Sequence, residues 1–205
     1  VISMKNEAKN ERILRIGILP AVIFCILLFF QPSVAVFASL GGAVLHESGH
    51  MLAAMLLEIP LRSLDIGIFG ASLKVRGSLI SYPKEFILCA AGPAMNFISA
   101  LAVIIFSKHR GYMGECGEWF VSVSVMLGLL NLIPAEGFDG GRMLSVALSS
   151  FLGPRISARI LSVSTFLSIV ALWMFSVYLL LRYGTSLSLF VFTLSLFYRI
   201  FIEKP

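Results

Sequence analysis

The sequence predicts an all-α polytopic membrane protein with about six transmembrane helices and a small β-hairpin or sheet after the second helix. The first observation is the composition: 58% of the 205 residues are hydrophobic and only 13% are charged. Soluble domains carry roughly 45–50% apolar and about 25% charged residues. The other observation is that the apolar residues come in runs close to the roughly 20 that a bilayer core requires. Both disfavour the alternative of a soluble helical protein.

The predicted spans follow these runs, and we expect the first run to be a retained helix and not a cleaved signal peptide. The spans lie at about residues 13–30, 34–57, 85–106, 118–133, 157–181 and 185–202. Residues 61–81 alternate apolar with polar or small side chains, which is typical of a hairpin. Residues 134–154 are predicted to form a loop and a short amphipathic helix. We expect one membrane-embedded domain over residues 1–205, with no soluble accessory domain.

The net charge of +5 predicts membrane orientation and not binding to nucleic acid, because the basic residues lie at the ends of the apolar runs. With the N-terminus in the cytoplasm, 13 of the 16 Lys and Arg residues fall on the cytoplasmic side. The exceptions are Lys108, Arg110 and Arg182. This distribution satisfies the positive-inside rule. It places the predicted hairpin and the 134–154 loop on the cytoplasmic side.

Three ionisable side chains interrupt the second span: His46, Glu47 and His50. Ionisable groups near a bilayer centre are costly and usually functional. Residues i and i+4 share one helix face, so both imidazoles can face one cation. The H-E-x-x-H pattern supplies two zinc ligands and a general base that activates water. The alternative is a pair of core histidines with local hydrogen bonds. His109, beside two basic residues, is predicted to be a solvated loop residue.

A catalytic zinc ion usually has three protein ligands, so we looked for a third near membrane depth. Asp139 and Glu136 follow the fourth predicted span in a segment rich in proline and glycine. Irregular backbone at membrane depth is tolerated where it lines a cavity. Asp139 is the better candidate and Glu136 the alternative.

These motifs resemble those of the site-2 protease family, the M50-type intramembrane metalloproteases. The H-E-x-x-H at 46–50 is followed by A-G-P-A-M-N at 91–96, similar to the family's G-P-x-x-N element. N-x-x-P at 131–134 and F-D-G-G at 138–141 are similar to its N-x-x-P…L-D-G-G element. Phe138 stands where leucine is common. The six-span layout resembles the branch typified by the stage IV sporulation protease.

The resemblance implies a zinc metalloendopeptidase that hydrolyses a peptide bond in or near a transmembrane segment. It implies one Zn²⁺ per chain, held by His46, His50 and Asp139, with Glu47 as catalytic base. Asn131 and Asn96 would bind the substrate backbone or the oxyanion, although each could instead be a structural hydrogen-bonding group between helices. The catalytic core would cover about residues 34–145.

The resemblance also implies a substrate and a location. The substrate would be a membrane protein or membrane-tethered peptide, such as a sigma factor precursor, with regulatory membrane partners acting on the enzyme. The chain would be integral to a bacterial cell membrane, or to the membranes around a forespore, with its active site open to the cytoplasm. Two other functions stay open at this point: a membrane metal-ion transporter and an inactive protease-like scaffold.

Overall fold

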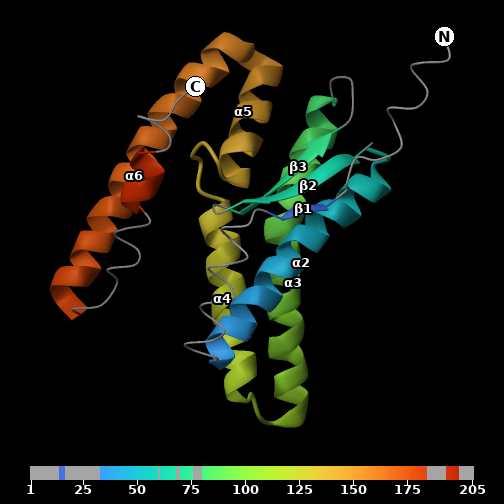
Figure 1. Cartoon of the computed structure of the whole chain (residues 1–205), viewed down its shortest axis with the longest axis vertical. Helices are drawn as coiled ribbons and strands as arrows, with labels where there is room; N and C mark the ends of the chain where they lie inside the picture. Colours follow the sequence, from blue (N-terminus) through green and yellow to red (C-terminus); the bar gives the residue numbers. More distant parts are fainter. Residues whose placement is uncertain are drawn as a thin grey trace. The chain divides into compact units, whose positions relative to one another are not determined.

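A computed structural model describes residues 14–16, 33–59, 61–67, 70–75, 80–183 and 193–198 of the chain (Figure 1). The elements in order are β1 (Leu14–Ile16), α2 (Val34–Leu56), β2 (Leu61–Gly67), β3 (Gly70–Val75), α3 (Tyr82–Arg110), α4 (Glu115–Asn131), α5 (Asp139–Leu152) and α6 (Pro154–Tyr183). They divide into two compact units, residues 1–128 and 129–205. The prediction of a single domain stays a prediction.

Helix α2 packs through a face of small residues in the first unit. Its buried positions include Ala38, Gly42, Gly49 and Ala53, spaced four or seven residues apart. A Cβ atom on Gly49 would lie 2.5 Å from the Ala91 carbonyl oxygen of α3, so the two helix backbones approach closely there. Small residues allow this approach where lipid provides no hydrophobic drive for helix association.

Helix α4 approaches the same two partners within the first unit. A Cβ on Gly42 of α2 would lie 3.4 Å from Ser124 Oγ of α4. A Cβ on Gly128 of α4 would lie 2.9 Å from the Phe97 ring of α3. The turn between α3 and α4 begins at Gly111, whose φ of 72° is the left-handed conformation that favours glycine at a helix C-terminus.

The strands of the first unit form a three-stranded sheet in the order β1-β2-β3. β2 and β3 pair antiparallel, from Leu61 opposite Val75 to Gly67 opposite Gly70, with a register irregularity between Leu61 and Ser63. β1 pairs parallel with β2, with Leu14 opposite Leu64. β3 is therefore an edge strand of the sheet.

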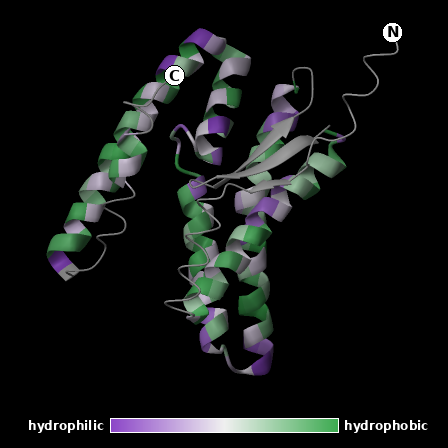
Figure 2. Cartoon of the chain, viewed as in Figure 1, coloured by the Kyte–Doolittle hydropathy of each residue, from purple (hydrophilic) through white to green (hydrophobic). Residues whose placement is uncertain are grey.

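The second unit is built on α5 and α6, which pack side by side (Figure 1). Gly153 ends α5 and Pro154 begins α6, in agreement with the predicted end of the short amphipathic helix. Ser157 Oγ of α6 donates a hydrogen bond of 2.8 Å to the Ser145 carbonyl of α5. Figure 2 shows that α6 is mostly apolar along its length, with hydrophilic residues at its ends.

The predicted fold class was wrong in two respects. Among the described residues, two helices are long and apolar enough to cross a membrane, Tyr82–Arg110 and Pro154–Arg182, and not the six that were expected. A strand, β1, also lies where a first helix was predicted, beside β2 and β3, which form the hairpin or sheet predicted after the second helix. β1 lies at the start of the segment that had been predicted as the first span.

The difference in span number has identifiable causes. His46, Glu47 and His50 lower the hydropathy of α2, and α4 is only 17 residues long. Most of the first predicted span, and most of the sixth, lie outside the described residues. Within the described residues, apolar runs therefore overstated the number of helices that meet the length and hydropathy of a span.

Candidate metal centre

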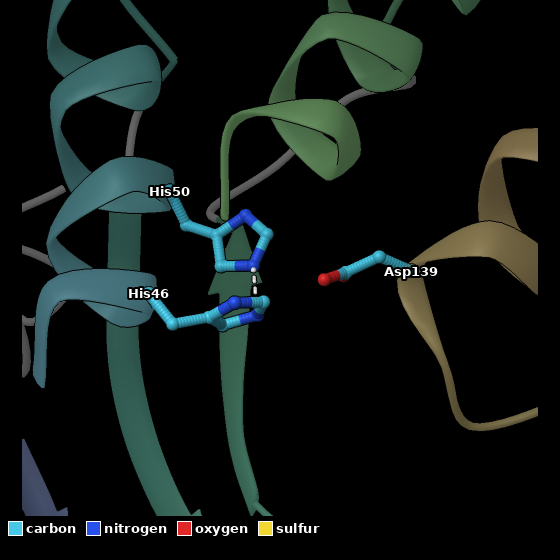
Figure 3. A group of neighbouring side chains, drawn as sticks. All are labelled: His46, His50 and Asp139. Carbon is cyan, nitrogen blue, oxygen red and sulfur yellow. Dashed lines mark hydrogen bonds between the residues drawn. The ribbon is translucent and has the colours of Figure 1, made fainter. Parts of the chain in front are cut away.

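The centre starts from two histidines one turn apart on α2. His46 and His50 lie on the buried face of the helix and are only 5% and 9% exposed. Their Nε2 atoms are 3.3 Å apart, and their rings meet edge to face (Figure 3). The spacing of four residues predicted this arrangement, because residues i and i+4 share a helix face. Two imidazole nitrogens therefore converge inside an apolar helix pair.

A backbone carbonyl of α3 fixes the orientation of one imidazole. His50 Nδ1 lies 2.8 Å from the Leu88 carbonyl oxygen, which can only accept a hydrogen bond. Nδ1 therefore carries the proton, and Nε2 of neutral His50 keeps a lone pair. If both histidines are neutral, the proton between the two Nε2 atoms must belong to His46 Nε2, which donates it to His50 Nε2. A bound metal ion would take the place of that proton. Such outer hydrogen bonds orient metal-binding histidines.

Gly92 of α3 provides the space that the imidazoles occupy. A Cβ atom at this position would collide with His50 Nε2 and would lie 2.8 Å from His46 Nε2. Gly92 and the following Pro93 are both buried. Because Pro93 has no amide proton, it cannot donate to the carbonyl four residues earlier in α3. The two rings thus rest directly on the backbone of a neighbouring helix.

Asp139 begins α5, where a tight loop returns the chain into a helix. Phe138 is the extended N-cap residue, and Asp139 is the acidic residue of the first turn. A carboxylate is favourable at a helix N-terminus because of the exposed amides and the helix dipole. Added Cβ atoms on Gly140 and Gly141 would collide with the carbonyl groups of Leu132 and Ala135. The two glycines therefore let the loop fold against the start of α5.

His46, His50 and Asp139 form a group that could hold a metal ion (Figure 3). Each offers one ligand atom, and these atoms lie within 4.8 Å of one another. Two imidazole nitrogens and one carboxylate oxygen are a donor set that zinc accepts, with a fourth position left for water or substrate. The chemistry of the donor set and the orientation of His50 fit zinc.

The other predicted residues occupy different surroundings. Glu47 is half-buried on α2, and Asn131 is half-buried as the last residue of α4. Asn96 of α3 is fully buried, and within the described part of the chain neither its Nδ2 nor its Oδ1 has a hydrogen-bond partner. Glu136, the alternative ligand, is exposed and outside the group. His109 is exposed, as predicted, but it lies in the last turn of α3 and not in a loop.

Comparison with known proteins shows which family the chain resembles. Residues 108–175 match the model of peptidase family M50. The matched segment covers about a third of the chain. The matched segment includes Asn131 and Asp139, whereas the histidine pair lies outside it. The expected M50 resemblance is confirmed, and the narrower placement in the stage IV sporulation branch stays a prediction.

Two proteins named as zinc metalloproteases extend the likeness along the chain. Rip3 of Mycobacterium tuberculosis, named as a zinc metalloprotease, is 28% identical over 151 residues, 71% of this chain and 37% of its own length. A zinc metalloprotease of Methanocaldococcus jannaschii is 32% identical over 123 residues, 57% of this chain and 35% of its own. The chain thus spans just over a third of the length of each of these two proteins.

A solved structure shares the fold. The site-2 protease from Methanocaldococcus jannaschii is similar with a TM-score of 0.60 and 22% sequence identity. The similarity covers 90% of this chain and 87% of that one. The chain therefore has the fold of this solved structure.

Two groups of α3 that contact the histidine pair were not predicted from the sequence: Gly92 and the Leu88 carbonyl. Gly92 was noted only as part of a motif, and the Leu88 carbonyl has no side-chain signal at all. One clue was available: Gly92 lies four residues before Asn96, so both fall on one face of α3. The contact with the histidines depends on where α2 and α3 cross, which periodicity alone does not specify.

Gly92→Ala should weaken metal binding strongly, beyond the modest loss of stability expected from overpacking. The new methyl group would occupy the space of the His46 and His50 rings, so we expect at least a tenfold weaker zinc affinity, measured by chelator competition. Gly128→Ala is the control, because its methyl group would press on the Phe97 ring. It should lower the thermal unfolding temperature and keep zinc. Zinc affinity unchanged in Gly92→Ala would contradict the role given to this contact.

Proposed function

We propose that the chain is an intramembrane zinc metalloprotease that hydrolyses a peptide bond in or near a transmembrane segment of its substrate. The observation that carries this proposal is the buried histidine pair of α2, with Nε2 atoms 3.3 Å apart and one ring oriented by a backbone carbonyl. Burying these polar rings without a partner ion would be costly in an apolar helix. The M50 family match and the names of the relatives support the same reaction.

In this proposal His46, His50 and Asp139 are the three protein ligands of one zinc ion. When bound, zinc supplies Lewis acidity, which polarises a carbonyl group and makes water acidic enough to act as a nucleophile near neutral pH. The two histidines bind as neutral imidazoles through Nε2, with the His50 tautomer held by Leu88. The Asp139 carboxylate adds negative charge and leaves one position open to substrate.

Glu47 acts as the general base. It follows His46 on α2 and is half-buried, so its carboxylate is partly shielded from bulk water. Glu47 takes a proton from the attacking water and later delivers it to the leaving amine. A positioned general base contributes about 10²–10⁴-fold to rate.

Asn96 and Asn131 bind the substrate backbone or the oxyanion. A buried amide without hydrogen bonds destabilises a fold by about 1–3 kcal/mol per unsatisfied group. The Asn96 amide is in this situation, which supports a role in binding an external partner. A carbonyl group or an amide of an unwound substrate would satisfy it.

A substrate helix must unwind before hydrolysis, because its amides are hydrogen-bonded internally. The edge strand β3 offers backbone groups that an extended substrate segment could pair with as an added strand. The sheet lies in the same unit as the two histidines. This supports capture of the substrate at the sheet before cleavage.

The finer biological assignments belong to the same proposal. The chain is an integral protein of a bacterial membrane, with its N-terminus and active-site opening in the cytoplasm, as the charge distribution indicates. Its substrate is a membrane protein or membrane-tethered peptide, for which a sigma factor precursor is one candidate. Regulatory membrane partners would control access to the site.

Glu47→Gln tests the reaction directly. The purified variant should bind zinc like the parent chain and should cleave co-expressed single-span membrane proteins at least about a hundredfold more slowly. Glu136→Gln is a matched carboxyl-to-amide change in an exposed loop, and it should leave both properties intact. Equal cleavage by parent and Glu47→Gln would contradict the proposal, as would zinc uptake into vesicles without any peptide cleavage.

Asn96→Leu separates a substrate-binding role from a structural one. Because the amide makes no hydrogen bond within the described structure, replacing it with an apolar group of similar size should leave the unfolding temperature equal or higher. Cleavage should slow by about tenfold or more, since losing an oxyanion donor costs up to 10²–10³ in rate. The control is Ser124→Ala. It removes a buried hydroxyl that, like the Asn96 amide, has no hydrogen-bond partner among the described residues, and it should not affect cleavage. A lower unfolding temperature with normal cleavage would indicate a structural role.

A further inference from the structure

In the loop that precedes Asp139, some backbone N–H and C=O groups have no hydrogen-bond partner within the loop itself. Within residues 132–138, the Ala135 amide bonds to the Ile133 carbonyl and the Phe138 amide to the Ala135 carbonyl. The Pro134 carbonyl and the Glu136 amide have partners outside the loop. Where water is excluded, such backbone groups need protein partners.

Two adjacent side chains of α6 supply these partners. Ser164 Oγ donates a 2.6 Å hydrogen bond to the Pro134 carbonyl. Thr165 Oγ1 accepts a 2.9 Å hydrogen bond from the Glu136 amide. Thr165 is 0% exposed, and the pair lies in the interior of a helix that is long and apolar enough to span a membrane. We call Ser164 and Thr165 the loop clip.

The loop and the first turn of α5 are in close backbone contact. The backbones of Gly140 and Gly141 touch the carbonyl groups of Leu132 and Ala135, with no room for a Cβ atom between them. A displacement of the loop by more than a few tenths of an ångström must therefore displace Asp139. The clip holds the loop on both sides of Ala135, which is itself fully buried.

We propose that Ser164 and Thr165 are positioning residues that set the location of the Asp139 carboxylate for the metal. This inference rests on the proposed function, because it takes Asp139 as a ligand. Neither hydroxyl contacts the metal; each acts through the loop backbone. Outer-shell groups that orient ligands typically change metal affinity by 10–100-fold when they are removed.

Thr165→Val tests the clip on the full chain. Valine keeps the volume and removes the acceptor for the Glu136 amide, so the zinc dissociation constant should rise at least tenfold in chelator competition. Thr165→Ser keeps the hydroxyl and should restore the parent affinity. Ser164→Ala is a second, milder variant that should also weaken binding, in case Thr165→Val fails to fold. The unfolding temperature of the metal-free protein is recorded for every variant.

Ser157→Ala is the matched control. Ser157 is also a fully buried hydroxyl of α6, but it bonds to the Ser145 carbonyl of α5 and not to the loop. It should lower the metal-free unfolding temperature and leave the zinc dissociation constant within about twofold of the parent, since its partner lies outside the ligand shell. Equal weakening of zinc binding by Ser157→Ala would overturn the specific role of the clip.

Asp139→Asn distinguishes failure of the clip from failure of the proposed function. Loss of zinc in Asp139→Asn, together with parent affinity in both Thr165→Val and Ser164→Ala, would overturn the clip alone. Parent affinity in Asp139→Asn would overturn the ligand assignment and the clip with it. Weakened binding in Thr165→Val that Thr165→Ser restores is the result that supports the proposal.

Discussion

The close approach of α2 and α3 is the constraint on which the candidate centre depends. At Gly49 a Cβ atom would meet the α3 backbone, and at Gly92 it would meet the two imidazoles. This proximity lets the Leu88 carbonyl reach His50 and fix its tautomer. A larger residue at either glycine would separate the helices by overpacking, which typically costs 1–3 kcal/mol. The two imidazoles can therefore lie together, with the His50 Nε2 lone pair free of a proton, because small residues let α2 and α3 approach closely.

A second constraint applies to the carboxylate. Asp139 follows a break in regular structure, and a break inside an apolar chain leaves backbone groups that must find protein partners. The Gly140-Gly141 pair brings the loop against α5, and hydroxyl groups of α6 bond to the loop. The position of the Asp139 carboxylate thus depends on backbone contacts of the loop and on hydroxyl groups of α6.

These constraints explain what the sequence could and could not predict. The ligating face of α2 was predictable, because a spacing of four residues fixes which side chains share a helix face. The choice between Asp139 and Glu136 was open from the residues, since loop geometry decides which carboxylate reaches the group. Gly92, Ser164 and Thr165 escaped notice because their importance lies in contacts between distant segments. The span number was overestimated, because an apolar run does not reveal a 17-residue helix or a strand such as β1.

The most direct test of the account is X-ray absorption spectroscopy at the zinc edge on the zinc-loaded chain and on Asp139→Asn. The account predicts a shell of nitrogen and oxygen ligands at about 2.0–2.2 Å with two imidazoles and no sulfur. In Asp139→Asn the carboxylate contribution and most of the bound zinc should disappear. An unchanged spectrum and zinc content in the variant, or a sulfur ligand in the parent, would contradict a centre made by His46, His50 and Asp139.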